Sequence, residues 1–506
     1  MKKNKLALIS LMMALILFIT ACNSSGGGGN TSSGSGGNSS SSSGGSAPAE
    51  VVMAYLNFGD ATDVQLVEDE INKITREKIN VVVDLMPIDI AAWQQQTNLL
   101  LAGNEKVDLI VSSAFFNYST QVSRGQLLEL DDLLEQYGQD IKGTMPDAIY
   151  NGTRINGKIY GIPSIRDFGA DYGMVMRKDL VDKYNIDLSK VKQWSDLTEV
   201  FKVIKQNEPG MAPLAPTTQT YQPARAMYMP EIDPLGDSLG VILIDDQDMK
   251  VVNLYELDLY REKIRLVREW YEAGYIYTDA ATTQETSANL VKAGQAFGYF
   301  NNMKPGYAVQ EGQLTNHEMV TVALSDVVIQ STGASSFMIS IARNSTDPVA
   351  AMKFMNLLYS DADVMNLLTN GIEGKHYVKK DNGFIAKPEG VTETGYQFNQ
   401  WEIGNNFLTY VWEGQDADIW EQTKKFNESG KVSPALGFTF DQGPVKSEVA
   451  AVTNVQNQYL VGLESGTLEY EMIDKFIEEL KAAGIDRIIE EKQRQLDEWA
   501  KANGKK

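Results

Sequence analysis

Residues 51–111 alternate between short apolar runs and amphipathic segments, and this alternation limits the possible folds more than any other feature. The runs at 51–57, 79–85 and 107–111 are rich in residues that favour strands. Helical patterns at 62–74 and 91–102 separate them. Strand, helix, strand, helix, strand is typical of a parallel sheet with right-handed crossovers, whose ligands bind beyond the carboxyl ends of the strands. The sequence therefore predicts an α/β fold.

Polar and aromatic residues stand directly after two of these predicted strands. Asn57 and Asp60 follow the first strand, and Phe115, Phe116 and Asn117 follow the third. The carboxyl ends of neighbouring parallel strands share one edge of the sheet. We therefore expect these five side chains to contribute to a ligand site.

The first 22 residues have the organisation of a bacterial export signal. Three lysines precede an apolar run at 6–19, which is too short to span a bilayer as a helix. The ending Ile-Thr-Ala-Cys at 19–22 resembles a lipobox. That resemblance implies removal of a signal peptide at 1–21 and acylation, including palmitate, of Cys22, the single cysteine of the chain. A secretory signal with a chance cysteine is the alternative. The lipid would hold the protein on the extracytoplasmic face of the cell membrane.

Residues 22–49 are nearly all Ser, Gly and Asn after the cysteine, without charge until the end of the segment. Such a composition cannot bury enough apolar surface to offset its ordering entropy. The sequence predicts a disordered tether between the lipid and a folded body.

The remaining composition excludes several classes of protein. The formal charge of −22 argues against binding nucleic acid or anionic lipid through a basic patch. With one cysteine, no disulfide can stabilise the body, so stability must come from a large core. The chain of 506 residues exceeds what one core usually supports, and two or more lobes are expected.

Four stretches resemble a known family. Residues 106–110 (KVDLI), 154–163 (RINGKIYGIP) and 172–180 (YGMVMRKDL) are similar to the sugar-type, family 1 solute-binding proteins of bacterial ABC importers, including the maltose-binding branch. Residues 370–377 (NGIEGKHY) resemble a lipoprotein subgroup of that family with its own C-terminal region. The order and spacing of the four stretches carry the resemblance, which covers nearly all of 51–506.

The resemblance implies a two-lobed, type II periplasmic-binding-protein-like fold. Each lobe would be a mainly parallel sheet flanked by helices, with a ligand cleft between the lobes. Residues 51–165 plus about 330–368 would form lobe 1, and residues 166–329 plus about 369–506 would form lobe 2. We expect a monomer that delivers a small-molecule ligand to the permease subunits of an ABC importer.

The second lobe supplies a further set of candidate ligand residues. Two of them follow the motif at which the chain crosses between lobes, one begins the second lobe, one lies in a proline-rich loop, and two follow a strand predicted at 295–300. They are Arg166, Asp167, Tyr172, Tyr221, Asn301 and Met303.

Large aromatic residues are concentrated at 401–420. Sugars present C–H faces that stack on aromatic rings and hydroxyls that need hydrogen-bond partners. Trp401 and Trp412 are therefore candidate stacking platforms facing lobe 1, although packing in the core is the alternative for any one ring. A charged amphipathic pattern at 469–500 predicts one final helix.

Catalytic and metal-binding patterns are poorly supported. The two histidines stand in unrelated contexts, and no phosphate-binding glycine loop or Gly-x-Ser-x-Gly motif occurs. We expect no enzyme activity, no cofactor and no metal. The alternative is an exported polysaccharide-active enzyme of the glycoside hydrolase type, because acids are plentiful and sequence does not measure their separation. The prediction is an extracytoplasmic binding protein for a carbohydrate or oligosaccharide that works by hinge closure; peptides and other solutes are left open.

Overall fold

The computed structural model describes residues 47–103, 105–216, 222–391 and 394–505. The predicted signal peptide, Cys22 and the predicted tether up to residue 46 lie outside the described residues, as does Tyr221. Residues Pro48–Lys506 form one compact unit. Two larger sheets within this unit, each with its own hydrophobic core, define a first and a second lobe.

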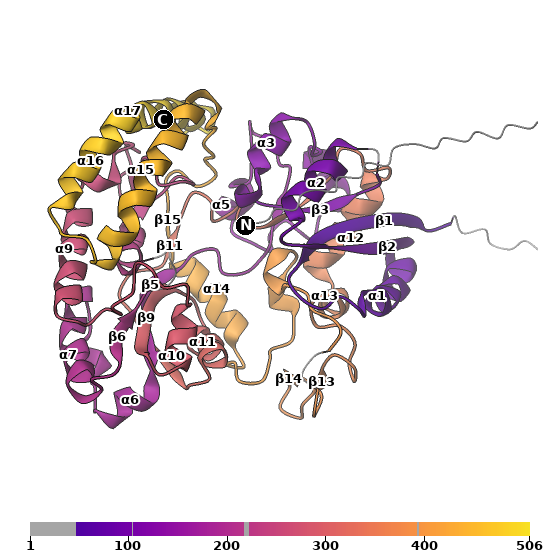
Figure 1. Cartoon of the computed structure of the whole chain (residues 1–506). Coiled ribbons are helices and arrows are strands. Elements are labelled where there is room, and N and C mark those ends of the chain that lie inside the picture. The colour runs from indigo at the N-terminus through magenta and orange to yellow at the C-terminus, as the bar shows by residue number, and fades with distance from the viewer. Residues whose placement is uncertain (1–46, 104, 217–221, 392–393, 506) are drawn as a thin grey trace, which may run out of the picture. The chain divides into compact units, whose positions relative to one another are not determined.

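The first sheet has the strand order β2-β1-β3-β12-β4, and Figure 1 labels its strands β1, β2 and β3. β1 (Ala49–Asn57) runs parallel to β2 (Val81–Asp89) and to β3 (Leu109–Ser112). β12 (Met338–Ile341) is antiparallel to β3 and to β4 (Ile162–Pro163). The strands predicted near the start of the body are thus confirmed, and β12 joins them from a distant part of the chain.

Helices cover this sheet and enclose the first core. α1 and α2 are the predicted crossover helices between β1, β2 and β3, and α12 and α13 follow β12. The helices of the first lobe are α1 (Val64–Ile79), α2 (Trp93–Ala102), α3 (Tyr118–Ser123), α4 (Asp131–Tyr137), α5 (Asp147–Asn151), α12 (Pro348–Ser360) and α13 (Ala362–Asn370).

A later segment also packs into the first core. Tyr396, Phe398 and Ile403 are buried there among residues of the first sheet. This differs from the expected boundary, which assigned everything after about 368 to the second lobe. The difference arises because the chain between α13 and α14 forms only a short strand pair, 3-10 turns and loops, so its apolar side chains are buried against whichever core lies beside them.

The second sheet has the order β10-β5-β9-β6, with strands β5 (Asp171–Arg177), β6 (Ala212–Ala215), β9 (Ala296–Met303) and β10 (Met319–Ala323). Only β6 and β9 are parallel, whereas β5 is antiparallel to both β9 and β10. The expected mainly parallel arrangement therefore does not hold within this sheet. β5 follows β4 of the first lobe directly, so the crossing between lobes, and not a helical crossover, sets its direction.

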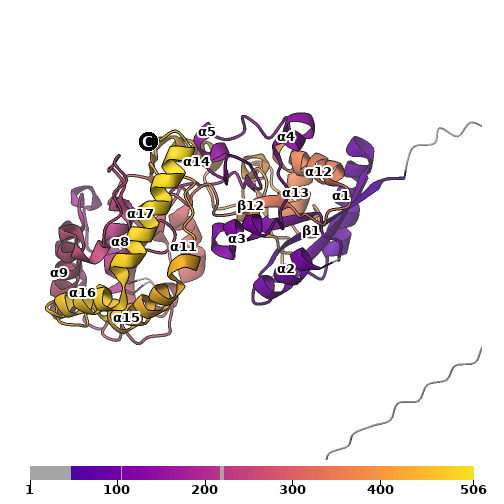
Figure 2. The same cartoon turned by 90° about the horizontal axis from the view of Figure 1, so that it is seen from above.

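The second core is the larger one and includes the C-terminal helices. α15 (Lys446–Ser465) packs against α8 (Pro223–Tyr228), α9 (Asp258–Glu272) and α17 (Ile485–Ala502) (Figures 1 and 2). The other helices around this lobe are α6 (Lys178–Lys183), α7 (Leu197–Asn207), α10 (Ser287–Lys292), α11 (Tyr307–Thr315), α14 (Ile419–Ser429) and α16 (Met472–Ala483).

The predicted final helix is two helices in the structure. Gly484, with φ of 101°, separates α16 from α17. That left-handed conformation is accessible to glycine at little cost, so the helix ends there and a new one begins.

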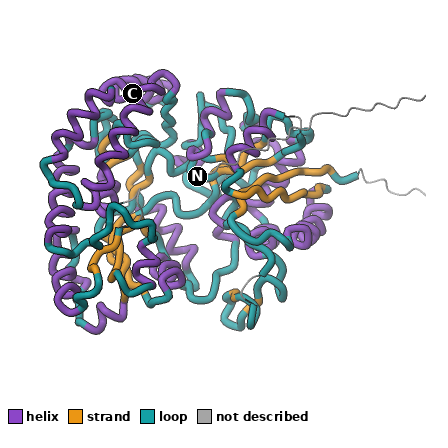
Figure 3. Tube along the Cα trace, in the orientation of Figure 1, coloured by secondary structure: helices purple, strands orange, loops and turns teal. Residues whose placement is uncertain are grey.

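Three short strand pairs complete the described structure (Figure 3). β7 (Ile232–Asp233) pairs with β8 (Ile242–Leu243), β11 (Val328–Ile329) with β15 (Lys431–Val432), and β13 (Val378–Lys379) with β14 (Ile385–Ala386). None of the helices in the described ranges combines the length and apolar character needed to cross a bilayer.

Candidate functional site

The carboxyl edge of the first sheet carries the turns that the sequence singled out. β1 ends at Asn57, and β3 ends at Ser112, which pairs with Met338 at the start of the antiparallel β12. After β3 the chain forms a 3-10 turn at Ala114–Phe116, whose first N–H groups are oriented by Ser113: its Oγ accepts a hydrogen bond from the N–H of Phe115 at 3.0 Å. Residues just after β1 and β3 and just before β12 therefore meet at one edge.

Aromatic rings gather at this edge and form what we call the aromatic row: Phe58, Phe115, Phe116, Phe337 and Trp401. Phe337 is central, with ring centroids 4.5 Å from Trp401 and 6.2 Å from both Phe115 and Phe116. The Trp401 ring also lies 5.7 Å from that of Phe58. Two members are exposed, Phe58 at 48% and Phe115 at 62%. Exposed rings that are held by contacts with neighbouring rings present a surface on which a flat apolar face can stack.

A buried carboxyl group supports this row. Glu402 is fully buried beside Trp401 and accepts hydrogen bonds from the N–H of Leu56 at 2.9 Å and from Asn399 Nδ2 at 2.8 Å. Burial raises the pKa of Glu402 from 4.5 to about 8, and the two hydrogen bonds oppose that rise. The Leu56 contact joins the Trp401 segment to the last residues of β1, and so fixes the ring at the sheet edge.

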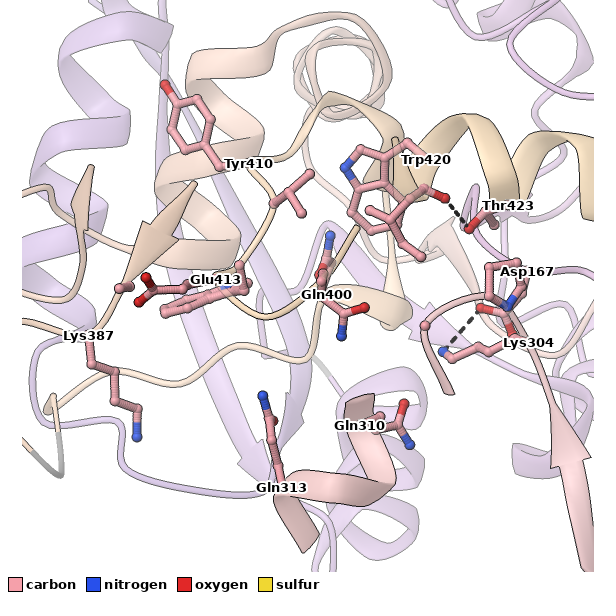
Figure 4. A pocket seen from close by; sticks show the side chains of 17 residues that line it. Asp167, Lys304, Gln310, Gln313, Lys387, Gln400, Tyr410, Glu413, Trp420 and Thr423 are labelled. Atoms are coloured by element: carbon pink, nitrogen blue, oxygen red, sulfur yellow. Dashed lines mark hydrogen bonds and ion pairs between the residues drawn. The ribbon is translucent and has the colours of Figure 1, made fainter. Parts of the chain in front are cut away.

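A cavity of about 670 Å³ lies near the row, between the 400–413 segment, α14 and the start of α11 (Figure 4). We call it the Trp412 cavity. Gln310 and Gln313 of α11 lie on one side and Gln400 faces them from the other (Figure 4). The Trp412 Nε1–H donates to Asn370 Oδ1 at 3.2 Å, which orients its ring. The remaining lining residues are Asp167, Lys304, Pro305, Gly306, Ala386, Lys387, Tyr410, Val411, Glu413, Gln415, Ile419, Trp420 and Thr423.

The charged groups of the Trp412 cavity are partly neutralised within it. Lys304 Nζ lies 3.3 Å from Asp167 Oδ1, and Asp167 also accepts a hydrogen bond from Arg166 at 3.3 Å. The Arg166 guanidinium in turn lies 6.0 Å from the centre of the Phe337 ring. This chain of contacts connects the cavity with the aromatic row. Amide side chains and aromatic rings therefore supply most of the remaining binding surface of the Trp412 cavity.

The structure brings together six of the candidate residues. Phe115, Phe116 and Trp401 belong to the aromatic row, Asp167 and Trp412 line the Trp412 cavity, and Arg166 lies over Phe337. Trp401 packs on the first core, and therefore not on the side of the cleft that the sequence assigned to it.

Three candidates from the first lobe form local contacts near the edge. Asn57 Nδ2 donates to the carbonyl of Gly59 at 2.9 Å, and Asp60 accepts from the N–H of Thr62 at 3.0 Å. Asn117 is exposed, its Nδ2 donates to Gln94 Oε1 at 3.3 Å, and both residues line a second cavity together with Phe115.

Three candidates from the second lobe are turned toward protein. Tyr172 is 6% exposed in the second core, and Met303 is 4% exposed in a smaller cluster around β9. Asn301 Nδ2 donates to the hydroxyl of Tyr307 at 2.6 Å. Tyr172 and Met303 lie inside β5 and β9, where alternate side chains must face the core.

Sequence reasoning missed several residues of the site. Phe58 stands between two residues that it did select, so its place after β1 was an available signal. Phe337 lies one residue before β12, within a pattern that reads as strand from the sequence. Gln310 and Gln313 carried no signal, because a pair of glutamines three residues apart is ordinary on a helix surface.

The side chains that could bind a metal ion are dispersed over the described part of the chain. Among the described residues, no three His, Cys, Asp or Glu side chains are grouped so that they could hold an ion. His376 accepts a hydrogen bond from the N–H of Ile372 at 2.8 Å and contacts Asp63 through Nε2 at 3.2 Å, which accounts for both ring nitrogens.

The family is decided by a match over more than half of the chain. Residues 71–372 match the model of the bacterial extracellular solute-binding proteins. The chain belongs to this family. Residues 434–501 of this solute-binding protein also match a domain of unknown function, DUF3502, in agreement with the expected subgroup with its own C-terminal region.

Relatives cover nearly the whole solute-binding protein. A carbohydrate ABC transporter substrate-binding protein of Streptococcus pneumoniae is 29% identical over 447 residues, 85% of this chain and 87% of that one. The crystal structure of the N-glycan transport solute-binding protein NgtS from the same organism has a TM-score of 0.79 at 24% identity, and covers 90% of this chain and 99% of its own. A complex of NgtS with Man5GlcNAc has a TM-score of 0.66 at 25% identity, with the same coverage. The predicted type II periplasmic-binding-protein-like fold is confirmed.

Proposed function

We propose that this solute-binding protein captures an uncharged oligosaccharide between its two lobes and delivers it to an ABC importer. The carrying observation is the aromatic row, with two rings exposed to solvent, beside a cavity lined by amides and further rings. Pyranose C–H faces stack on such rings, and amides pair with the hydroxyls as donors and acceptors. The names of the relatives, which bind or transport carbohydrate, support the same ligand class.

Closure of the two lobes around the ligand is proposed because the residues of the site come from both lobes. The Trp412 cavity takes Lys304 and Gln310 from the second lobe, whereas Gln400 belongs to a segment that packs on the first core. A ligand that contacts both sets stabilises the arrangement in which they approach. The segments that pass between the lobes run beside one another, since the N–H of Ile165 donates to the carbonyl of Gly404 at 2.8 Å and that of Ala170 to Val328 at 3.1 Å. Bending of these segments is the proposed hinge.

The proposed location is the extracytoplasmic face of the membrane, with Cys22 carrying the lipid. The family is extracellular, and the lipobox-like 19–22 segment supports the anchor. The proposed partners are the permease subunits, and the proposed state of the protein itself is a monomer. The ligand would leave unaltered, because the protein acts as a carrier and not as an enzyme.

Isothermal titration of the full chain with Man5GlcNAc tests the ligand class. Trp401→Ala should weaken binding about tenfold, because a stacking ring contributes ~1 kcal/mol beyond its buried area. Tyr137→Ala is the matched control, since Tyr137 also packs partly buried on the first core but belongs to α4, outside the aromatic row and the Trp412 cavity. Equal losses in both variants would refute a stacking role.

Mass spectrometry of the recovered sugar separates the carrier from an enzyme. The expected result is intact sugar after prolonged incubation. New reducing ends would replace the proposed function with the glycoside hydrolase alternative. Absence of binding to a panel of neutral oligosaccharides that includes Man5GlcNAc would overturn the proposal itself.

A further inference from the structure

The C-terminal stretch that matches a domain of unknown function forms one wall of a second cavity of about 670 Å³. The loop at 438–443 and Lys446 lie on one side, and Gln94, Asn98 and Phe115 of the first lobe lie on the other. We name this space the C-terminal cavity. We propose that it binds the far end of an oligosaccharide whose other sugars occupy the aromatic row and the Trp412 cavity. The inference rests on the proposed function and assigns a role to residues 434–501.

The lining has the chemistry of a site for a neutral sugar. Phe115, the most exposed ring of the aromatic row, also lines this cavity, so one ring surface is shared between the two places. Gln94, Asn98 and Asn117 supply amides that donate and accept hydrogen bonds with hydroxyl groups. Ring contacts continue from Phe115 through Phe337 to Trp401, at 6.2 Å and 4.5 Å between centroids. A bound chain of sugars would thus meet apolar ring surface along this path.

The second-lobe wall is held in place by buried polar contacts. Lys492 of α17 is fully buried, forms an ion pair with Asp237 and donates to the carbonyl of Gly240 at 3.1 Å. Asp237 lines the cavity and also accepts a hydrogen bond from Gln442 Nε2 at 2.9 Å. Burying a lysine is costly unless its partners are well placed, and an apolar residue would pack there at lower cost. The buried ion pair therefore serves to hold this part of the second lobe in a fixed position, as the wall of a binding site requires.

A second set of bonds joins the same helix to the loop. Gln495 of α17 accepts from the N–H of Asp441 at 2.9 Å and donates to the carbonyl of Asp441 at 2.9 Å. The Lys492 ammonium lies 4.9 Å from the centre of the Phe440 ring. Two neighbouring loop residues, Phe440 and Asp441, are thereby held by one helix of the C-terminal region. The wall is preorganised, which lowers the entropic cost of binding.

Charge balance indicates an uncharged sugar. The charged side chains that line the cavity are two cations, Arg124 and Lys446, and two acids, Asp237 and Asp441. Asp237 is already paired with Lys492 from behind. The formal charges of the lining sum to zero and Lys492 adds a single cation behind it, so the cavity holds no cluster of cations for a sugar with several negative charges.

Titration of the full chain with a long and a short sugar tests the assignment. Man5GlcNAc is the long probe and its fragment mannobiose is the short one. Asn98→Trp and Thr439→Trp fill the cavity from opposite walls, and each should weaken Man5GlcNAc about tenfold while changing mannobiose less than about twofold. Gln95→Trp and Thr453→Trp are the matched controls, because both are exposed, lie on α2 and α15, and are absent from the cavity lining.

The outcomes separate this inference from the proposed function. The C-terminal cavity is not a site for the far end of the sugar if both blocking variants bind Man5GlcNAc with wild-type affinity. The same conclusion follows if they lower the affinities for Man5GlcNAc and mannobiose equally. In either case the proposed sugar binding is unaffected. If the wild type binds another oligosaccharide of the neutral panel instead, that sugar and its disaccharide fragment replace the two probes. If it binds none of the panel, the proposed function fails and this inference fails with it. A thermal scan identifies any variant that does not fold, and the variant on the opposite wall then decides.

Discussion

Aromatic residues are exposed to solvent at the carboxyl edge of the first sheet and buried within the strands of the second sheet. At the first sheet, Phe58 and Phe115 follow strand ends and remain 48% and 62% exposed. At the second sheet, Tyr172 and Phe300 lie within strands and are 6% and 0% exposed. A ring just beyond a strand escapes the alternation that buries every second side chain within it. Rings of the first kind are available for a ligand, and those of the second kind hold the lobe together.

The largest effect that tests this contrast is on stability. Phe300 contacts Trp194 at 4.9 Å and Trp270 at 5.9 Å between ring centroids. Phe300→Ala should lower the free energy of unfolding by about 3–5 kcal/mol, because it opens a cavity among fully packed rings. Phe115→Ala should lower it by no more than about 0.5 kcal/mol. Urea unfolding measures both, and similar losses would remove the distinction between the two edges.

A second test uses the buried glutamate of each lobe. Burial raises the pKa of Glu402 from 4.5 to about 8 and that of Glu464, in the second core, from 4.5 to about 7. Each folded site therefore keeps its proton at pH values where the unfolded chain has released it. The stability that each contributes is complete below pH 4.5 and is lost as the pH rises through the folded pKa.

Urea unfolding over a series of pH values checks this dependence. The stability of the wild type should fall from about pH 4.5 to about pH 8. Glu402→Gln should remove the part of that fall between about pH 7 and pH 8, whereas Glu464→Gln should leave it in place. Sugar affinity should change in Glu402→Gln and not in Glu464→Gln, because Glu402 bonds the Trp401 segment to β1, whereas Glu464 bonds Tyr228 in the second core. A fall that persists unchanged in the Glu402 variant would contradict the assignment.

The smallest effect separates the edges by ligand affinity. Phe115→Ala should weaken Man5GlcNAc about tenfold, because an exposed stacking surface is lost. Tyr172→Phe should leave affinity within about twofold of the wild type, since the ring is buried away from the cavities. Isothermal titration of both variants makes the comparison, and a larger effect of Tyr172→Phe would show that the second-sheet edge also takes part.

Local patterns predicted the first lobe well. The strands and helices from β1 to β3 depend on contacts between near neighbours in the chain, so apolar periodicity was sufficient to identify them. Phe115 and Phe116 were found for the same reason, because the end of a strand is a local signal. Phe337 was not found, since its closeness to β3 depends on β12 returning from more than 200 residues away.

The candidates of the second lobe show the limit of this reasoning. Met303 was chosen because a strand was predicted to end at residue 300, whereas β9 continues to Met303 and turns this side chain into a buried cluster. Tyr172 was chosen as the first residue of the second lobe, and it lies within β5 with its ring in the second core. Asn302, next to Met303, is the exposed residue. The direction of β5 was equally hidden, because it depends on the crossing from the first lobe.

The amino-acid sequence alone determined the α/β class. It also predicted an export signal, a tether and a ligand site at the edge of the first sheet, and these stay predictions. These follow from composition and from periodicities of a few residues, which record local burial. Tertiary structure decided that Trp401 belongs to the first lobe and that glutamines of α11 face Gln400 across the Trp412 cavity. It also decided that the C-terminal region lines a second cavity. Such choices depend on which surfaces meet after collapse, and pairwise packing between distant segments leaves no periodic trace in the chain.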